Sequence, residues 1–354
     1  MRSDREVPTQ SGKRWILLCG MLILGVLITL VGISYSGEEN TGTGQDELLT
    51  NIAGYGELAI SQSHTYRNMT LFILSRTAQE IEKPVDCITL DEGLTKKIVL
   101  VTEKEQAEVR TLQVENLSEQ PLFIQVGDVL KGGKQDRTVQ ASLIIPPKSG
   151  KVDVPSLCVE QSRWQGAVMS FGKAGNSANS NDLKMAIQQG DQGQVWEEVA
   201  EYKDKAEKIT GINSKTSSLN EEMDSEKMKQ ACAEYEKNFT DILKQYPRAI
   251  GVAYVLNGKT QTVELFQNNG LFQKTYAKIL NAFATDAVVN PASGETIPVT
   301  NGTIKYFLAE MEKGETKKQA IAENEILRLE NDSGFSSEVK DPEDRVMHRQ
   351  YLKK

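Results

Sequence analysis

Histidine and cysteine are scarce in this chain of 354 residues, which contains two histidines and four cysteines. The histidines, His64 and His348, lie far apart, and no cysteines are paired at zinc-site spacing, so we expect no bound metal. After the N-terminal apolar segment only Cys87, Cys158 and Cys232 remain. Three widely spaced cysteines exclude a disulfide-rich scaffold and leave open whether one disulfide forms or none.

An excess of positive charge is also absent. The first 36 residues hold four of the 41 basic and two of the 49 acidic residues, which leaves 37 basic and 47 acidic residues, a net charge of −10, in the rest of the chain. An acidic domain repels phosphate backbones, so nucleic acid is excluded as a partner. With 39% hydrophobic and 25% charged residues, the composition indicates a folded globular protein.

Long apolar runs are missing except at residues 15–33, an uncharged run of about 19 residues, close to the roughly 20 that a membrane-spanning helix needs. Four basic residues precede this run, and the next basic residue after it is Arg67. The charge bias places residues 1–14 in the cytoplasm as a tail and the folded domain outside it. Secretory signals have apolar cores of about 7 to 15 residues, so residues 15–35 are interpreted as a membrane anchor, with a signal sequence as the alternative.

The part that follows the anchor begins with a flexible tether and continues as a β-rich lobe. Residues 36–56 are small and polar, which is typical of a tether. Residues 57–170 contain short runs of β-forming residues at close intervals, which predict an antiparallel meander or sandwich. These runs lie at 68–74, 97–103, 109–116, 121–128, 137–145 and 151–160.

Residues 171–354 have a helical pattern interrupted by hairpins. Apolar residues recur every three or four positions over 195–209, 228–246 and 272–283, which predicts amphipathic helices. Asn257-Gly258 between two apolar runs predicts a hairpin, a further helix is expected near 303–312, and 325–329 and 345–352 are expected as edge strands. The predicted fold is α+β, with a β-rich N-terminal half packed on a helix-plus-hairpin C-terminal half in one continuous domain, preceded by one transmembrane helix.

The stretch GDVLKGGKQDRTVQ, residues 127–140, crowds charge into a turn between two apolar runs. If residues 131–134 form the turn, in which the glycines supply positive φ, side-chain alternation places Asp128 across from Arg137. Aligning the apolar faces across the next reversal, at 146–150, pairs Arg137 with Glu160. We therefore predict that Arg137 lies between the carboxylates of Asp128 and Glu160 at one end of an apolar face.

This charged cluster has two interpretations. It is either an ion network that closes the end of a core, worth about 1 kcal/mol or less per pair, or the polar part of a small-ligand pocket with an aromatic wall. In the second case Lys134, Arg137 and Arg163 hold a carboxylate or phosphate, and Glu160 is the candidate general acid or base. The ligand-binding candidates are Asp128, Lys134, Gln135, Arg137, Arg163 and Trp164.

Other motifs that would carry chemistry are missing from the sequence. NGKT at 257–260 has Ala253 where a phosphate-binding loop needs glycine. No serine lies in a G-x-S-x-G elbow, and neither histidine has a nucleophile beside it in the sequence, so nucleophilic hydrolysis has no local signature. No cofactor is expected.

Five segments follow one another in the order GDVLKGGKQDRTV, CVEQSRW, QVWEEV, IGVAYVLNGKTQTVELF and LFQKTYAKIL. Over residues 60–352 the chain resembles the domain family associated with ADP-ribosylglycohydrolases and rhodanese-like phosphatases, and this resemblance implies a domain without an established activity. The glycine-lysine-glutamine motif of the family falls on Gly132, Gly133, Lys134, Gln135 and Arg137. Its glutamate-arginine-tryptophan motif falls on Glu160, Arg163 and Trp164. Asp136 stands where the family pattern usually has asparagine.

Three functions are compatible with these features. The first is a membrane-tethered, extracytoplasmic domain that binds a small anionic ligand at the motif cluster. The second is a hydrolase-like enzyme that acts on a phospho- or glycosyl compound related to ADP-ribose. The third is a structural or protein-interaction module of the cell envelope. Whether the protein is an enzyme stays open at this point.

Overall fold

The computed structural model describes residues 47–78, 84–104, 110–161, 170–211, 216–292, 294 and 298–354. The predicted cytoplasmic tail and membrane segment, residues 1–35, lie outside the described residues, as does most of the predicted tether. Among the described helices, none combines the length and apolar composition that a membrane crossing requires. The described part is α+β, and its sheets are almost entirely antiparallel.

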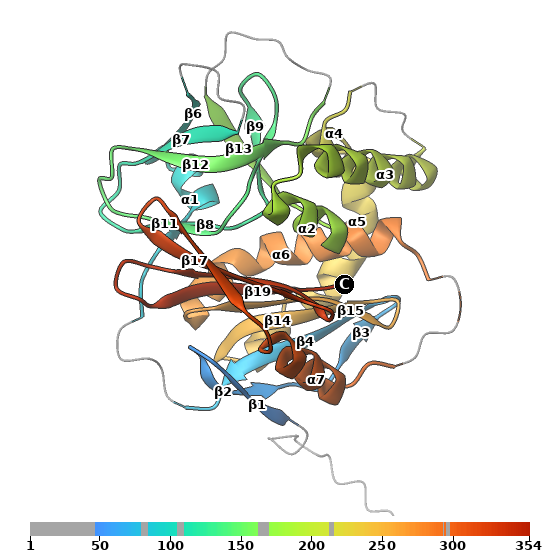
Figure 1. Cartoon of the computed structure of the whole chain (residues 1–354). Coiled ribbons are helices and arrows are strands. Elements are labelled where there is room, and N and C mark those ends of the chain that lie inside the picture. The colour runs from blue at the N-terminus through green and yellow to red at the C-terminus, as the bar shows by residue number, and fades with distance from the viewer. Residues whose placement is uncertain are drawn as a thin grey trace, which may run out of the picture. The chain divides into compact units, whose positions relative to one another are not determined.

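A ten-stranded antiparallel sheet forms the base of the fold and joins the two ends of the described chain (Figure 1). Its strand order is β1-β2-β4-β14-β15-β19-β18-β17-β16, and β3 pairs with β4. Because β4 pairs with β14, residues from the two halves of the sequence share one sheet. The strands are Leu48–Ile52 (β1), Gly56–Ile60 (β2), His64–Tyr66 (β3), Met69–Arg76 (β4), Ala249–Leu256 (β14), Lys259–Phe266 (β15), Thr316–Ile321 (β16), Asn324–Asn331 (β17), Gly334–Lys340 (β18) and Val346–Lys353 (β19).

Two smaller sheets are built from the middle of the chain. The six-stranded sheet has the order β13-β9-β10-β12-β7-β6, and the three-stranded sheet has the order β11-β8-β5, in which β5 and β8 are parallel. Their strands are Ile88–Thr89 (β5), Val99–Glu103 (β6), Thr111–Asn116 (β7), Leu122–Ile124 (β8), Asp128–Gly132 (β9), Arg137–Val139 (β10), Leu143–Ile145 (β11), Lys151–Cys158 (β12) and Phe171–Ser177 (β13).

The helices begin and end at residues suited to capping. Asp191 ends the loop before α3, and its carboxylate accepts hydrogen bonds from the N–H groups of Gly193 and Gln194. Gly190 and Gly211 close α2 and α3 with φ values of 76° and 65°, a conformation that glycine adopts without strain. The helices are Leu90–Thr95 (α1), Asn181–Gln189 (α2), Gln192–Thr210 (α3), Leu219–Met223 (α4), Glu226–Phe239 (α5), Asn269–Val289 (α6), Asn301–Met311 (α7) and the 3₁₀ helix Ile242–Gln245.

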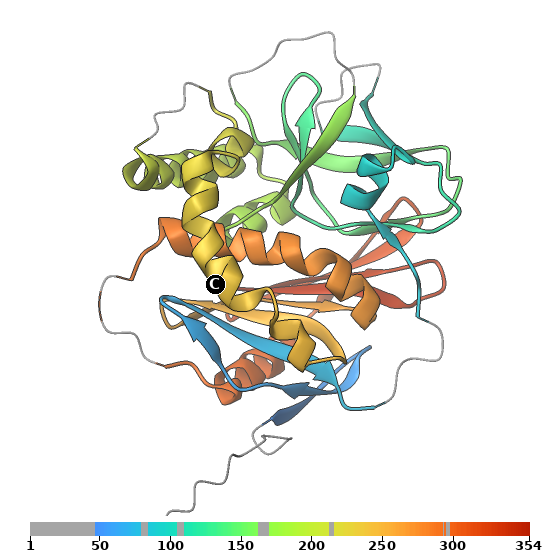
Figure 2. The ribbon, with the colours of Figure 1, turned by 180° about the vertical axis from the view of Figure 1, so that it is seen from behind.

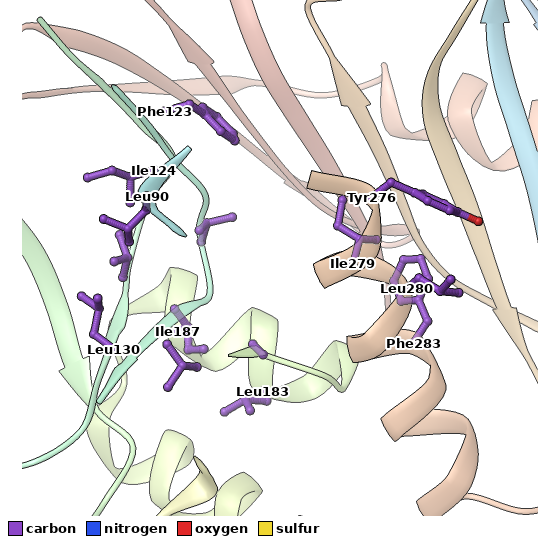
Figure 3. Close-up of a cluster of buried hydrophobic side chains, with 14 of the residues drawn as sticks. Leu90, Phe123, Ile124, Leu130, Leu183, Ile187, Tyr276, Ile279, Leu280 and Phe283 are labelled. Atoms are coloured by element: carbon purple, nitrogen blue, oxygen red, sulfur yellow. The ribbon is translucent and has the colours of Figure 1, made fainter. Parts of the chain in front are cut away.

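Two hydrophobic cores lie on opposite faces of the large sheet. Along β4, Leu71 and Ile73 belong to the larger core, whereas Phe72 and Leu74 belong to the smaller one, because successive side chains of a strand point to opposite faces. Helix α7 covers the smaller core, and α6 runs between the large sheet and the smaller sheets (Figures 1 and 2). Figure 3 shows the larger core, with α6 contributing Ile279 and other apolar residues opposite side chains from β8, β9 and α2.

A buried carboxylate lies where the smaller sheets and α2 meet the large sheet. Glu264 on β15 is only 1% exposed. Its Oε2 accepts hydrogen bonds from Gln125 Nε2 at 2.5 Å and His348 Nε2 at 3.3 Å. Its Oε1 accepts one from Gln350 Nε2 at 3.1 Å and lies 3.6 Å from Lys184 Nζ on α2. Glu264 therefore connects two strands of the large sheet to α2 and to the turn after β8.

The charge of Glu264 is stabilised by its partners. Burial by itself would raise the pKa of Glu264, but the hydrogen bond from His348 and the charge of Lys184 outweigh it and lower the pKa to about 2. Because a carboxylate only accepts, His348 Nε2 carries the proton that faces Glu264, and its Nδ1 is hydrogen-bonded to the hydroxyl of Ser142 at 3.0 Å. The carboxylate of Glu264 is ionised, and both of its oxygens are hydrogen-bonded to described residues.

The sequence-based elements are partly confirmed. Helices occur over 192–210, 226–239 and 269–289, and the hairpin at Asn257-Gly258 forms with positive φ at both residues. The predicted strands 121–128 and 137–145 are each broken in two, because a turn at 125–127, with Gly127 at φ +84°, and the segment 140–142 carry the ribbon from one small sheet to the other. Residues 48–52, expected as tether, form β1.

The prediction of edge strands at the C-terminus is wrong. β19 lies between β15 and β18, and β17 lies between β18 and β16. The edge is β16, whose residues are mostly exposed and include Lys317 and Lys318. Lysines on an exposed edge discourage pairing with another chain, which is a property that hydrophobic patterning alone does not reveal.

Replacing Glu264 by glutamine retains the shape of the side chain but leaves Lys184 and His348 facing a neutral amide. We expect the free energy of unfolding at pH 7 to fall by about 3 kcal/mol, the scale of a broken buried ion pair. Since the pKa of Glu264 is lowered on folding, its contribution is complete above the unfolded pKa and is lost as pH falls toward about 2. The free energies of unfolding of the wild type and the variant, measured in urea, should therefore converge as the pH is lowered.

The matched control is Glu325→Gln, which removes the partner of Lys318 from an exposed pair with a distance of 3.2 Å. Such a pair is worth about 0.5 kcal/mol, so this variant should unfold almost like the wild type. Equal losses in the two variants at pH 7 would contradict the central role of Glu264.

Candidate functional site

The motif loop, defined here as residues 132–137, turns one residue later than expected. Arg137 pairs with Leu130, so the reversal is centred on Gly133 and Lys134. Gly133 has a φ of +55°, and a Cβ on it would lie 2.3 Å from the ring of Phe171. Only glycine fits a position that is both left-handed and in such close contact.

Three buried carboxylates hold the backbone of the motif loop. The N–H of Lys134 donates to Glu103 Oε1 at 2.7 Å. The N–H of Gly132 donates to Asp136 Oδ1 at 3.0 Å, and the N–H of Asp136 donates to Glu160 Oε2 at 3.2 Å. Hydrogen bonds to ionised acceptors are roughly twice as strong as neutral ones. Of these three carboxylates only that of Asp136 belongs to the charged stretch 127–140, and those of Glu103 and Glu160 come from other segments of the chain and fix the loop from outside.

Arg137 supports the loop from the core side. It is 1% exposed and is among the largest fully buried side chains of the described residues. Its Nη2 lies 3.7 Å from Glu103 Oε1, and its Nη1 donates to Gln135 Oε1 at 3.2 Å and to the sulfur of Cys158. A buried guanidinium needs such partners to offset its loss of hydration. Arg137 thus faces the protein interior, where it neutralises Glu103.

Cys158 is a structural residue of this network. Its backbone N–H and C=O form two 2.8 Å hydrogen bonds with the side chain of Gln192 on α3, and its thiol donates to Gln135 Oε1 at 3.1 Å. Burial raises the pKa of the Cys158 thiol, so it stays protonated at neutral pH. Cys87, Cys158 and Cys232 are all free and buried, so these three form no disulfide.

Asp136 ties the motif loop to α4 and β13. Its Oδ2 accepts hydrogen bonds from Ser218 Oγ at 2.9 Å and Asn220 Nδ2 at 2.8 Å. Asn220 in turn accepts a hydrogen bond from Asn176 Nδ2 on β13 at 2.9 Å. With the N–H of Gly132, the carboxylate of Asp136 accepts from at least three donors among the described residues, a number that suits its two oxygens.

The predicted arrangement of Arg137 between Asp128 and Glu160 is wrong. Arg137 pairs with Leu130 and Cys158 in the strand register, two residues away from the expected partners in both cases. The later reversal of the motif loop causes the first shift. The second arises because the first half of β12 pairs with β7, while β11 pairs with β8. The carboxylate beside Arg137 is that of Glu103 on β6.

Asp128 belongs to a different part of the molecule. Its carboxylate contacts Lys278 on α6 and accepts the N–H of Gln125 at 3.1 Å, and Lys278 also lies 3.3 Å from Asp91 on α1. Burial raises the pKa of Asp128 to about 6, which still leaves it ionised at neutral pH. Lys278 lines a cleft of about 940 Å³ between α1, β13, α5 and α6. This ion pair clamps the smaller sheets to α6.

The remaining predicted site residues fall into three groups. Lys134 lies at the rim of the motif loop near Lys131, whose Nζ is 3.6 Å from Asp224. Gln135 is buried and donates to the carbonyl of Gln161 at 3.3 Å. The predicted Arg163 and Trp164 lie outside the described residues.

The motif loop and the side chains bonded to it are called the motif network below. A cavity of about 360 Å³ borders this network. It is lined by Gln161, whose carbonyl binds Gln135, and by Ser217, which precedes the Asp136 partner Ser218. Its aromatic wall is Trp196 on α3, and the indole Nε1 is buried without a hydrogen-bond partner among the described residues. The volume and the mixed lining are those of a small-molecule site.

Several residues of the network were not foreseen from the sequence. Glu103, Gln192, Trp196, Ser218 and Asn220 come from three segments that are distant along the chain. Only Gln192 and Trp196 gave a signal, because they lie in or beside QVWEEV, one of the segments that carry the family resemblance. The others belong to a strand and a short helix of ordinary composition.

A second arrangement was also missed, a hydrogen-bonded chain of Ser142, His348 and Glu264. It has the residue types of a hydrolase triad. However, the cavity next to Ser142 measures only about 10 Å³, room for about one water molecule. The arrangement therefore fits the interior network of Glu264 rather than a reaction with a substrate.

No candidate metal site is found in the ranges that the structure describes. No three histidine, cysteine, aspartate or glutamate side chains come together there in a way that would hold an ion. The motif network instead uses its carboxylates to bind backbone N–H groups and Arg137.

Comparison with known proteins adds one match. The family model of the ARG and Rhodanese-Phosphatase-superfamily-associated Protein domain matches residues 57–352, which is most of the chain. No curated protein and no solved structure was found to match. The match covers the motif loop, Glu160 and both halves of the described fold.

Asp136→Asn tests whether this chain depends on the carboxylate at a position where the family pattern usually has asparagine. The amide would offer one acceptor oxygen and one NH₂ group to three groups that now donate hydrogen bonds. Rotating the side-chain amide of Asn220 to compensate would break its hydrogen bond with Asn176. We expect the free energy of unfolding to fall by about 2 kcal/mol, the scale of a hydrogen bond to a charged group. In urea unfolding, the exposed control Asp332→Asn should have the same free energy of unfolding as the wild type. An unchanged free energy of unfolding in Asp136→Asn would contradict this role.

Proposed function

The chain belongs to the ARG and Rhodanese-Phosphatase-superfamily-associated Protein domain family, and on this premise we propose that it binds a small anionic ligand beside the motif loop. One observation carries the proposal: a loop held rigid by buried carboxylates is linked, through the hydrogen bond from Gln135 to the carbonyl of Gln161, to a cavity of about 360 Å³ with an indole wall. A site that is organised before the ligand arrives loses less conformational entropy on binding.

Within this proposal the motif residues have different tasks. Arg137, Gln135 and Asp136 position the loop from the core side, because their side chains are buried and bonded to the protein. Lys134 contributes the positive charge at the rim, since its backbone is held while its side chain is half-buried. Arg163 and Trp164, proposed from the sequence, would add a bidentate anion contact and a second indole.

Glu160 is the residue on which the enzymatic alternative depends. Its side chain is buried, and its Oε2 accepts the N–H of Asp136. This contact favours a positioning role over proton transfer to a ligand. Under the binding proposal Glu160→Gln, which keeps an acceptor oxygen, retains affinity for the ligand within about threefold, or 0.65 kcal/mol. Under the enzymatic alternative it abolishes turnover.

The location of the domain is part of the proposal. The apolar run at 15–33 and the basic residues before it support a single-pass anchor with a cytoplasmic N-terminus. The folded part would then lie outside the cytoplasm, where the anionic ligand would be an extracytoplasmic one.

Ligand binding can be measured by tryptophan emission and thermal shift of the purified chain. The probes are inorganic phosphate, citrate, AMP and ADP-ribose, and a bound probe should raise the melting temperature. Lys134→Ala should weaken the affinity for the tightest-binding probe about tenfold, or 1.4 kcal/mol of binding free energy. Lys229→Ala, in an exposed pair on α5, is the matched control. The emission change should be lost in Trp196→Phe.

Two outcomes of that experiment would contradict the proposal. One is that no probe shifts the melting temperature, which would favour a structural module. The other is that Lys134→Ala and Lys229→Ala bind the best probe equally, which would place the anion site elsewhere.

The anchor is tested by fractionation of cells that express the full chain. We expect the chain to stay in the membrane pellet after extraction with alkaline carbonate, and a variant without residues 1–36 to be released. Protease added to the outside of intact spheroplasts should degrade the folded part. Release of the full chain by carbonate, or its protection from protease, would contradict the proposed anchor or its orientation.

A further inference from the structure

A second cavity, of about 470 Å³, lies away from the motif loop. Its walls come from α2, α3, the turn between β14 and β15, and the end of α6. None of the proposed anion-site residues lines it. Four carboxylates and two lysines face it, which gives a lining of net negative charge. An anionic ligand is therefore disfavoured here.

Three buried oxygen atoms in the walls have no hydrogen-bond partner among the described residues. They are Tyr202 Oη, Asn181 Oδ1 and Asn257 Oδ1, and Tyr202 is only 4% exposed. The amide nitrogens of Asn181 and Asn257 are used, because they donate to the carbonyls of Lys353 and Asn290. Flipping either amide would break these bonds, so the oxygen of each amide is the atom without a partner among the described residues.

The carboxylates of this cavity are unequally satisfied. Asp286 accepts from Tyr254 Oη and Asn290 Nδ2, both at 2.9 Å, and Glu201 lies 2.7 Å from Lys205. Asp182 has no ion-pair partner in the described part of the chain. Glu198 accepts only from Gln194 there, at 2.7 Å. Burial raises the pKa of Glu198, and the nearby charge of Asp182 adds to this effect.

The cavity thus combines acceptor oxygens that lack donors with carboxylates that lack cations. Buried polar atoms without partners cost free energy, and they are expected where a ligand supplies the missing bond. A ligand with N–H donors and positive charge meets both needs. We propose that this cavity binds a small organic cation with primary or secondary ammonium groups, such as a diamine.

In this assignment Tyr202, Asn181 and Asn257 accept hydrogen bonds from the ammonium group, and Asp182 and Glu198 supply the opposite charge. A neutral sugar has donors but no charge, and a quaternary ammonium ion has charge but no N–H donor. Each matches only half of the lining. The site is independent of the proposed anion site, since it shares no residue with it and selects the opposite charge.

Isothermal titration of the purified full chain with putrescine, choline and glucose tests the assignment. We expect saturable binding of putrescine to one site, and at least tenfold weaker binding of choline and glucose. Choline that binds as tightly as putrescine would overturn the role of the acceptor oxygens. Absence of putrescine binding would overturn the site itself, whatever the result at the motif loop.

Tyr202→Phe gives a test that a merely structural tyrosine would not pass. Because the hydroxyl has no partner in the described structure, its removal should leave the melting temperature without ligand unchanged or slightly raised. The same variant should bind putrescine about fivefold to tenfold more weakly. The control is Tyr306→Phe, a tyrosine that is 68% exposed, which should change neither value.

Asp182→Asn complements this variant by removing charge from an exposed residue, with little risk to folding. It should also weaken putrescine binding about fivefold, whereas Asp332→Asn should not. Wild-type putrescine affinity in both Tyr202→Phe and Asp182→Asn would overturn the proposal. A clear drop in the melting temperature of ligand-free Tyr202→Phe would do so as well, because it would mean that the hydroxyl already has a partner.

Discussion

The buried carboxylate of Glu264 is the interaction on which the relative placement of the elements depends. It receives hydrogen bonds from Gln125, His348 and Gln350 and lies beside Lys184, so one side chain links the large sheet, the smaller sheets and α2. A charge this deep is tolerated only with its partners in place. The surrounding apolar core is non-directional, and this network selects one way of docking the parts.

The motif network applies the same principle at the periphery. Burying Arg137 with Glu103, and binding backbone N–H groups with three carboxylates, makes a short glycine-rich loop rigid. Within the charged stretch Asp136 and Arg137 support the loop, whereas Asp128 pairs with Lys278 on α6. Contact with a ligand is left to the few groups at the rim and to the cavity beside Trp196.

Local patterns predicted the parts of the structure that depend on local physics. The 3.6-residue periodicity located the main helices, and Asn257-Gly258 located a hairpin, because both signals act within a few residues. The register of the motif strands was missed because it depends on Glu103 and on pairing with β7, which lie outside the stretch. The predicted aromatic wall, Trp164, lies outside the described residues, and Trp196 was not foreseen as an indole of the cavity.

By itself the sequence determined the α+β class, the acidic surface, the family and the identity of the motif, since these follow from composition, periodicity and the order of short segments. Only the tertiary structure decided which carboxylate lies beside Arg137, that Asp128 pairs with Lys278, and that His348 binds Glu264. Such pairs join residues that are far apart in the chain. Which of many acids meets a given base depends on strand register and sheet docking, and these are settled by the packing of the whole domain.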